Sequence, residues 1–115
     1  MVLAVAACVP AVANARRGAS GRQASAILRA ARLGSNPPVR CFHIYISTVN
    51  SSWATATFGG SLKGGCARVA SNGVVVVHFK QGHWRFVTEG SSFSCPVPGH
   101  IPSRVQHDLR LACAP

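Results

Sequence analysis

Hydrophobic positions near the amino terminus recur with the period of a helix. Apolar residues stand at positions i, i+3, i+4 and i+7 of one segment and would form a single apolar helix face: Ala24, Ile27, Leu28 and Ala31. Gly34 favours a helix end, and Pro37 with Pro38 prevents the helix from resuming. The pattern therefore predicts an amphipathic helix that begins at Ser20 or Ser25.

After this segment the apolar residues alternate with polar ones or form short runs, as they do in β-strands. Residues 39–58 alternate around an Asn-Ser-Ser turn sequence, which predicts two strands, and residues 67–69 could add a short third. The clearest element is residues 73–89, a predicted β-hairpin with Gly82 in its turn. Its continuous apolar run, residues 74–77, is typical of a central strand covered on both faces.

The carboxyl-terminal part of the chain predicts a short helix and an irregular end. Pro102 suits a first helical position, and the helix would run through Asp108 with Val105 and Leu109 facing inward. The whole pattern predicts an α+β fold class, in which an N-terminal amphipathic helix packs on a small antiparallel β-sheet of about three to five strands. Residues 24–115 would form this single domain, with the C-terminal segment pinned by a disulfide.

The first fifteen residues are typical of the end of a secretory signal peptide. A short apolar stretch leads to Ala13 and Ala15, small residues at the two positions that a signal peptidase reads, and basic residues follow at once. We therefore predict a signal peptide at residues 1–15 and a flexible basic lead-in at residues 16–23. Two alternatives are lipid attachment at Cys8 and a buried segment of a cytosolic domain. No apolar run reaches the ~18–20 residues that span a bilayer, so we expect no transmembrane span in the mature chain.

The number of cysteines supports export. Removal of Cys8 with the signal peptide leaves an even number, which in a short exported chain indicates two disulfides among Cys41, Cys66, Cys95 and Cys113. Four cysteines allow three connectivities, and sequence alone does not choose among them. We expect Cys41–Cys66 and Cys95–Cys113 because each bond closes a local loop, with a contribution of ~3 kcal/mol in the chain-entropy model. No C-x-x-C pair is present, which argues against structural zinc.

Several short motifs lie in the second half of the chain: Trp53-Ala54, Gly82-His83-Trp84-Arg85, Cys95-Pro96, Ile101-Pro102, Val105, Asp108-Leu109 and Cys113. In the segment from Trp53 to Cys113 that contains them, the chain resembles small uncharacterised exported proteins of high-GC bacteria. The resemblance covers about half of the chain, and its motifs have low specificity. It implies export and the pairing of Cys95 with Cys113, and it implies no activity.

The charge of the chain is strongly one-sided. Twelve lysine and arginine residues stand against two acidic residues, and the formal net charge is +10. A protein this basic is attracted to polyanions at low salt, and for an exported bacterial protein these are cell-envelope polymers, anionic lipid headgroups and extracellular DNA. Arg22, Arg29 and Arg32 lie on the polar side of the predicted helix and are the candidate anion-binding residues. The competing interpretation is a solvated surface that has no ligand.

The sequence offers little catalytic or metal-binding chemistry, and we predict no catalytic residue, no metal and no cofactor. The two acidic residues are expected at the surface, Glu89 near Arg85 and Asp108 near Arg104. The five histidines show no H-x-H or H-x-x-x-H spacing, and no G-x-S-x-G elbow occurs.

Specific nucleic-acid recognition is also not expected. No RNP, zinc-finger or helix-turn-helix signature is present. Strand patterns place the aromatic residues in the core and not on a basic stacking platform: Phe42, Trp53, Phe79, Trp84 and Phe86.

These observations rank three functions for a protein that we expect to be secreted, either extracellular or associated with the cell surface. The first is a disulfide-stabilised, non-catalytic binding module, whose partner is an anionic cell-envelope polymer or a protein. The second is a secreted enzyme inhibitor, because residues 94–98 form a rigid proline-containing loop. The third is a small histidine-dependent hydrolase, which would need His78, Asp108 and a serine to come together in the fold.

Overall fold

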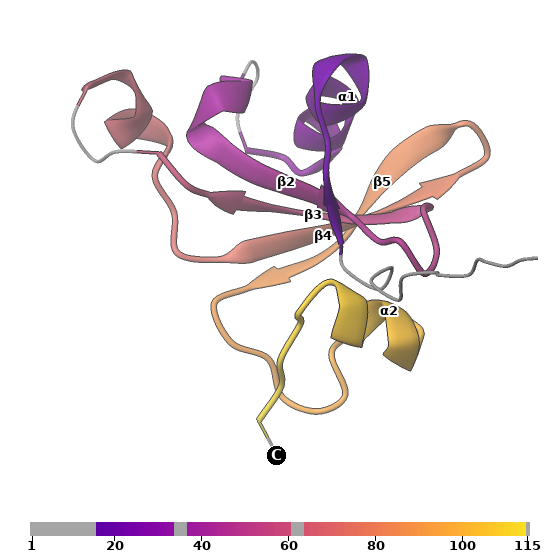
Figure 1. Cartoon of the computed structure of the whole chain (residues 1–115). Coiled ribbons are helices and arrows are strands. Elements are labelled where there is room, and N and C mark those ends of the chain that lie inside the picture. Colours follow the sequence, from indigo (N-terminus) through magenta and orange to yellow (C-terminus); the bar gives the residue numbers. More distant parts are fainter. Residues whose placement is uncertain (1–15, 34–36, 61–63, 115) are drawn as a thin grey trace, which may run out of the picture.

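A computed structural model describes residues 16–33, 37–60 and 64–114. Within these residues one antiparallel sheet contains five strands in chain order: β1 (Arg17–Gly18), β2 (Phe42–Ile46), β3 (Trp53–Phe58), β4 (Val74–Lys80) and β5 (His83–Gly90). Helix α1 (Gly21–Ala30) covers one face of the sheet, and the C-terminal segment with α2 (Ser103–Asp108) covers the other (Figure 1). The predicted α+β fold class is therefore confirmed. The predicted signal peptide and Cys8 lie outside the described residues.

Helix α1 packs on the sheet through the apolar face that its sequence predicts. Ala24, Ile27 and Leu28 are buried, whereas Arg22 and Arg29 are exposed on the other side. Full burial of an aliphatic side chain such as isoleucine or leucine contributes roughly 1.5–3 kcal/mol, so packing on the sheet holds this short helix in place.

The segment that we predicted as a flexible lead-in, residues 16–23, contains regular structure. Arg17 and Gly18 form strand β1 on the outer edge of β2, and α1 begins at Gly21. The Ala19 N–H donates to a β2 carbonyl at 2.9 Å as the chain leaves the sheet. The edge of β2 presents backbone groups that need partners, and the lead-in supplies them despite having no apolar period.

Strand β4 separates two hydrophobic clusters. Val75 and Val77 pack in the cluster that contains α1, whereas Val76 packs in the cluster that contains α2, with Val74 at its margin. Successive side chains of a strand point to opposite faces, so a continuous apolar run serves both layers. The prediction of a central strand covered on both faces is confirmed.

A tight turn and a bulge shape the β4–β5 hairpin. Gln81 and Gly82 form the two-residue turn with φ of 53° and 84°, the left-handed geometry that suits the twist of a hairpin. Further along, Val77 pairs with Phe86 and Val76 pairs with Thr88. Val87 is therefore an extra residue on β5, and this β-bulge reverses the alternation of side chains along the strand.

The first disulfide joins two short 3₁₀ helices. Cys41 ends η2 (Val39–Cys41), and Cys66 lies in η3 (Gly64–Val69), with their Cα atoms 5.5 Å apart. The prediction of a short strand at residues 67–69 was wrong. This segment forms part of η3, which the disulfide links to the residue directly before β2. A Cβ atom on Gly60 would lie 2.7 Å from the Cys66 sulfur, so the bond needs glycine beside it.

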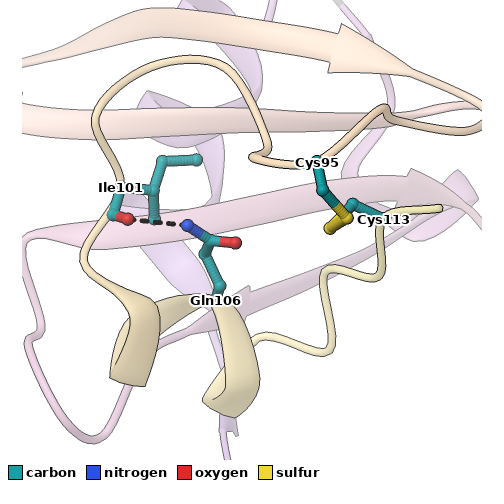
Figure 2. The surroundings of a disulfide bond; sticks show 4 residues. All are labelled: Cys95, Ile101, Gln106 and Cys113. Carbon is teal, nitrogen blue, oxygen red and sulfur yellow. Dashed lines mark hydrogen bonds between the residues drawn. A yellow bond between two sulfur atoms is a disulfide. The ribbon is translucent and has the colours of Figure 1, made fainter. Parts of the chain in front are cut away.

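The second disulfide joins Cys95 to Cys113, whose Cα atoms are 5.1 Å apart, and pins the C-terminal segment as predicted (Figure 2). Ser94 and Ala114 form a parallel bridge next to it. Between the two cysteines the chain turns through α2, and Gln106 Nε2 donates to the Ile101 carbonyl at 2.7 Å (Figure 2). Both disulfides thus join the cysteines that the sequence analysis paired.

We expect the double substitution Cys95→Ser/Cys113→Ser to lower the free energy of unfolding by about 3 kcal/mol, because it releases a loop of 18 residues in the unfolded chain. Urea unfolding of the oxidised protein, followed by Trp fluorescence, measures this loss. The parent protein with Ala114→Gly, which keeps the disulfide, is the control. A loss below about 1 kcal/mol would contradict a stabilising role for this bond.

Candidate functional site

The most elaborate polar cluster of the described residues is built around the Asp108 carboxylate. Asp108 Oδ2 accepts hydrogen bonds from Ser47 Oγ at 2.8 Å and from the Thr48 N–H at 2.7 Å, and Thr48 Oγ1 lies 3.3 Å from Oδ1. Ser47 Oγ in turn accepts the N–H groups of Val49 and Asn50, each at 3.1 Å. One carboxylate at the end of α2 therefore holds the whole turn between β2 and β3.

Asp108 is nearly fully buried, with 5% of its surface exposed. Burial alone would raise the pKa of Asp108, but hydrogen bonds from Ser47, Thr48 and the Val49 backbone outweigh that effect and lower the pKa below its ordinary value of 3.8. The carboxylate is thus held in its charged form by donors that have no charge. The prediction that Asp108 lies at the surface near Arg104 was wrong.

The helical spacing of α2 explains this correction. Val105 and Leu109 are buried, and Asp108 lies three residues after one and directly before the other, so it shares their inward face. The sequence contained this information, because a helix that buries residues i and i+4 also turns residue i+3 inward.

Glu89 is exposed on strand β5 and also lacks the arginine that we predicted beside it. Because of the bulge at Val87, Glu89 and Arg85 lie on opposite faces of the sheet. Glu89 pairs with Val75 and lies on the face covered by α1, whereas Arg85 pairs with His78 and lies on the other face. Arg85 instead donates to Gln81 Oε1 at 3.3 Å. With Asp108 buried, Glu89 is the acidic side chain that remains exposed among the described residues.

The three candidate anion-binding arginines do not form one site. Arg22 and Arg29 line the same open hollow on the outer side of α1, together with Ser25 and Val39. Arg32 follows the end of the helix with a φ of 60°, and its guanidinium lies 4.4 Å from the centre of the Phe86 ring. The structure therefore brings two of the predicted residues together, whereas the third forms a cation–π contact with the sheet.

A second open hollow lies on the other side of Arg29, between α1 and the β4–β5 hairpin. Its lining combines Arg29 and His83 with the aromatic rings of Phe79 and Trp84. The two rings meet edge to face, with centroids 5.3 Å apart. Phe79 is 41% exposed, so its predicted core position was wrong. It does share a face with Val77, but it lies near the hairpin tip, where α1 leaves it uncovered.

The hydrolase hypothesis would need a histidine beside Asp108, and the described residues do not provide that arrangement. His78 stacks on Trp53 with ring centroids 3.8 Å apart, and burial, followed by the charge of Lys80, lowers the pKa of His78. Ser47, the serine that contacts Asp108, is completely buried. Among residues 16–33, 37–60 and 64–114, no group of three His, Cys, Asp or Glu residues could hold a metal ion.

The loop considered for enzyme inhibition is tied to the domain instead of standing clear of it. Val97, in the middle of residues 94–98, is buried in the cluster that contains α2. The Cys95 N–H donates to the Ala114 carbonyl at 3.2 Å, and the Cys95–Pro96 peptide bond is cis. Ser94, Pro96 and Pro98 remain exposed around this anchor.

Comparison of the chain with protein-family models, with curated proteins and with solved structures found no match. Neither described helix has the length and apolar character to cross a membrane.

Asp108→Ala should destabilise the protein by roughly 2–3 kcal/mol, because it removes the carboxylate that accepts hydrogen bonds from the buried Ser47 hydroxyl and from the Thr48 N–H. Asp108→Asn keeps an acceptor oxygen and should cost only about 1 kcal/mol. Thermal and urea unfolding measure both changes. The matched control is Glu89→Gln, which removes the exposed acid and should change stability by less than about 0.5 kcal/mol. Equal losses of stability in Asp108→Ala and Glu89→Gln would contradict the role of Asp108 in holding the turn between β2 and β3.

The contribution of Asp108 should also depend on pH. Its pKa is lower in the folded protein than its ordinary value of 3.8, so the unfolded chain binds the proton first as the solution is acidified. The stabilisation is therefore complete well above pH 3.8 and is lost as the pH falls through 3.8 towards the lower folded pKa. Urea unfolding at several pH values measures the gap in the free energy of unfolding between wild type and Asp108→Asn. This gap should narrow on acidification. A gap that stays constant or widens would contradict this assignment.

Proposed function

We propose that the protein is a secreted, disulfide-stabilised, non-catalytic binding module that attaches to an anionic surface through the outer side of α1. The observation that carries this proposal is the imbalance of exposed charge. Asp108 is buried and Glu89 is the exposed acid of the described residues, whereas these cationic side chains are exposed: Arg17, Arg22, Arg29, Arg32, Arg40, Arg68, Lys80, Arg85, Arg104 and Arg110.

Secretion is supported by two independent features of the chain. The first fifteen residues are predicted to be a signal peptide. The two disulfides, Cys41–Cys66 and Cys95–Cys113, are of a kind that persists in oxidising compartments. A small domain gains most from such bonds, because its core is limited in size.

The position of Arg22 and Arg29 favours them over the other cations as the binding site. They lie seven residues apart on one helix, with Ser25 between them, and they share one open hollow. Guanidinium groups that are free at the surface can form bidentate hydrogen bonds with phosphate or carboxylate groups. Two of them on one rigid helix would present a fixed spacing to a repeating polyanion. The inhibitor and hydrolase hypotheses have no comparable support from the described residues.

The test is retention of the oxidised protein on immobilised heparin as salt is raised. Wild type should elute well above ~0.15 M ionic strength, where interactions between separate exposed charges are already strongly screened. Arg22→Gln/Arg29→Gln should elute earlier and lower the dependence of log retention on log salt by about two. Arg104→Gln/Arg110→Gln removes the same charge from α2 and the segment after it and is the matched control.

The site-specific proposal requires the α1 double variant to lose clearly more affinity than the α2 control. Equal losses would show that only net charge matters and that the outer side of α1 is not a site. Complete elution of wild type below ~0.15 M would remove anion binding altogether.

A further inference from the structure

We propose that the tip of the β4–β5 hairpin inserts into the headgroup region of an anionic lipid membrane, with Phe79 and Trp84 as its apolar anchor. This proposal rests on the proposed anion binding and specifies that the anionic surface is a lipid membrane. The hairpin tip is defined here as residues 79–85, which comprise the last two residues of β4, the turn and the first three residues of β5.

An exposed aromatic pair marks this tip. Phe79 and Trp84 are cross-strand partners, and their rings pack edge to face with centroids 5.3 Å apart. Phe79 is 41% exposed, more than any other large hydrophobic side chain of the described residues. The left-handed turn at Gln81 and Gly82 keeps the two strands close, so the rings are held side by side on a narrow element.

Basic side chains flank the tip. Lys80 and Arg85 belong to it and are exposed, and Arg29 of α1 lines the same hollow as the two rings. No acidic residue lies within residues 79–85, and Glu89 is located near the far end of β5. Each basic residue near an anionic membrane tightens binding several-fold.

This combination fits a membrane better than a soluble polyanion. A polysaccharide or nucleic-acid backbone would interact with the cations, but it would gain little from an exposed phenylalanine beside an alanine-lined helix surface. The boundary between headgroups and acyl chains offers anions and an apolar phase within a few ångströms, and tryptophan and phenylalanine are enriched in elements that lie there. Figure 1 shows the hairpin bending away from the rest of the sheet on the α1 side, and residues 79–83 and Arg85 of its tip are exposed.

The two tryptophans provide a direct readout. Trp53 is 4% exposed in the cluster that contains α2, whereas Trp84 is only partly buried at the hairpin tip. A blue shift of the emission on adding vesicles, together with quenching by brominated lipid, would therefore report on Trp84. The oxidised full chain is titrated with vesicles of phosphatidylglycerol and phosphatidylcholine in equal amounts, and with vesicles of phosphatidylcholine alone.

Wild type should bind the phosphatidylglycerol vesicles with a blue shift and bind the neutral vesicles at least about tenfold more weakly. Phe79→Ser should weaken binding to the anionic vesicles about tenfold, and Phe79→Leu should retain most of it. Heparin retention should be the same for all three proteins, because the substitutions leave the charge unchanged. Every variant carries the same residues 1–15, so a difference between them reports on the hairpin.

Two outcomes would overturn the proposal, and they are distinguishable from failure of anion binding itself. If wild type is retained on heparin but Phe79→Ser binds the anionic vesicles as tightly as wild type, the hairpin is not the anchor. If wild type binds these vesicles without a blue shift or quenching, the attachment is electrostatic only. Loss of heparin retention in wild type would instead overturn the proposed function on which this inference rests.

Discussion

The fold depends on a single buried carboxylate that joins its last helix to its first long hairpin. Asp108 ends α2, and its hydrogen bonds to Ser47 and Thr48 fix the turn between β2 and β3. That turn also supports the next hairpin, because the Ser52 carbonyl accepts the Phe79 N–H at 2.7 Å. A continuous set of hydrogen bonds thus connects the C-terminal segment with the end of β4. The disulfide at Cys95–Cys113 constrains the same segment from its other end.

Burial of Asp108 also determines the character of the surface. A chain with two acidic residues loses half of them to the interior, and the other, Glu89, is separated from Arg85 by the bulge in β5. The exposed arginines among the described residues therefore have no carboxylate neighbour to neutralise them. Two arginine side chains, the half-buried Arg16 and the exposed Arg32, instead contact aromatic rings: Arg16 lies over Tyr45 at 3.7 Å and Arg32 over Phe86 at 4.4 Å. Cation–π contacts hold these groups in position and leave their charge unneutralised.

The sequence predicted the elements well because apolar periodicity records which face of each element is buried. It identified α1, the β4–β5 hairpin and α2, and the local loop argument identified both disulfide pairs. It did not reveal how far a strand extends beyond the helix that packs on it, so Phe79 at the hairpin tip was placed in the core. It also missed the bulge at Val87 and the 3₁₀ helix at Gly64–Val69, because these depend on strand register and on a covalent bond between distant residues. Helical spacing could have predicted that Asp108 faces inward, but fully buried carboxylates are so rare that a surface position was the natural expectation.

If the protein attaches to a polyanionic surface, as we propose, the irregular outer strands of the sheet affect how its copies behave there. Attachment raises the local concentration of the chain, and a long regular strand with unpaired backbone groups would then become a template for fibrillar assembly. On one side the sheet terminates in only two residues, Arg17 and Gly18. On the other side the kink at Val87 interrupts the row of free amide and carbonyl groups. Dense packing of many copies would therefore leave each one without a ready strand partner in its neighbours.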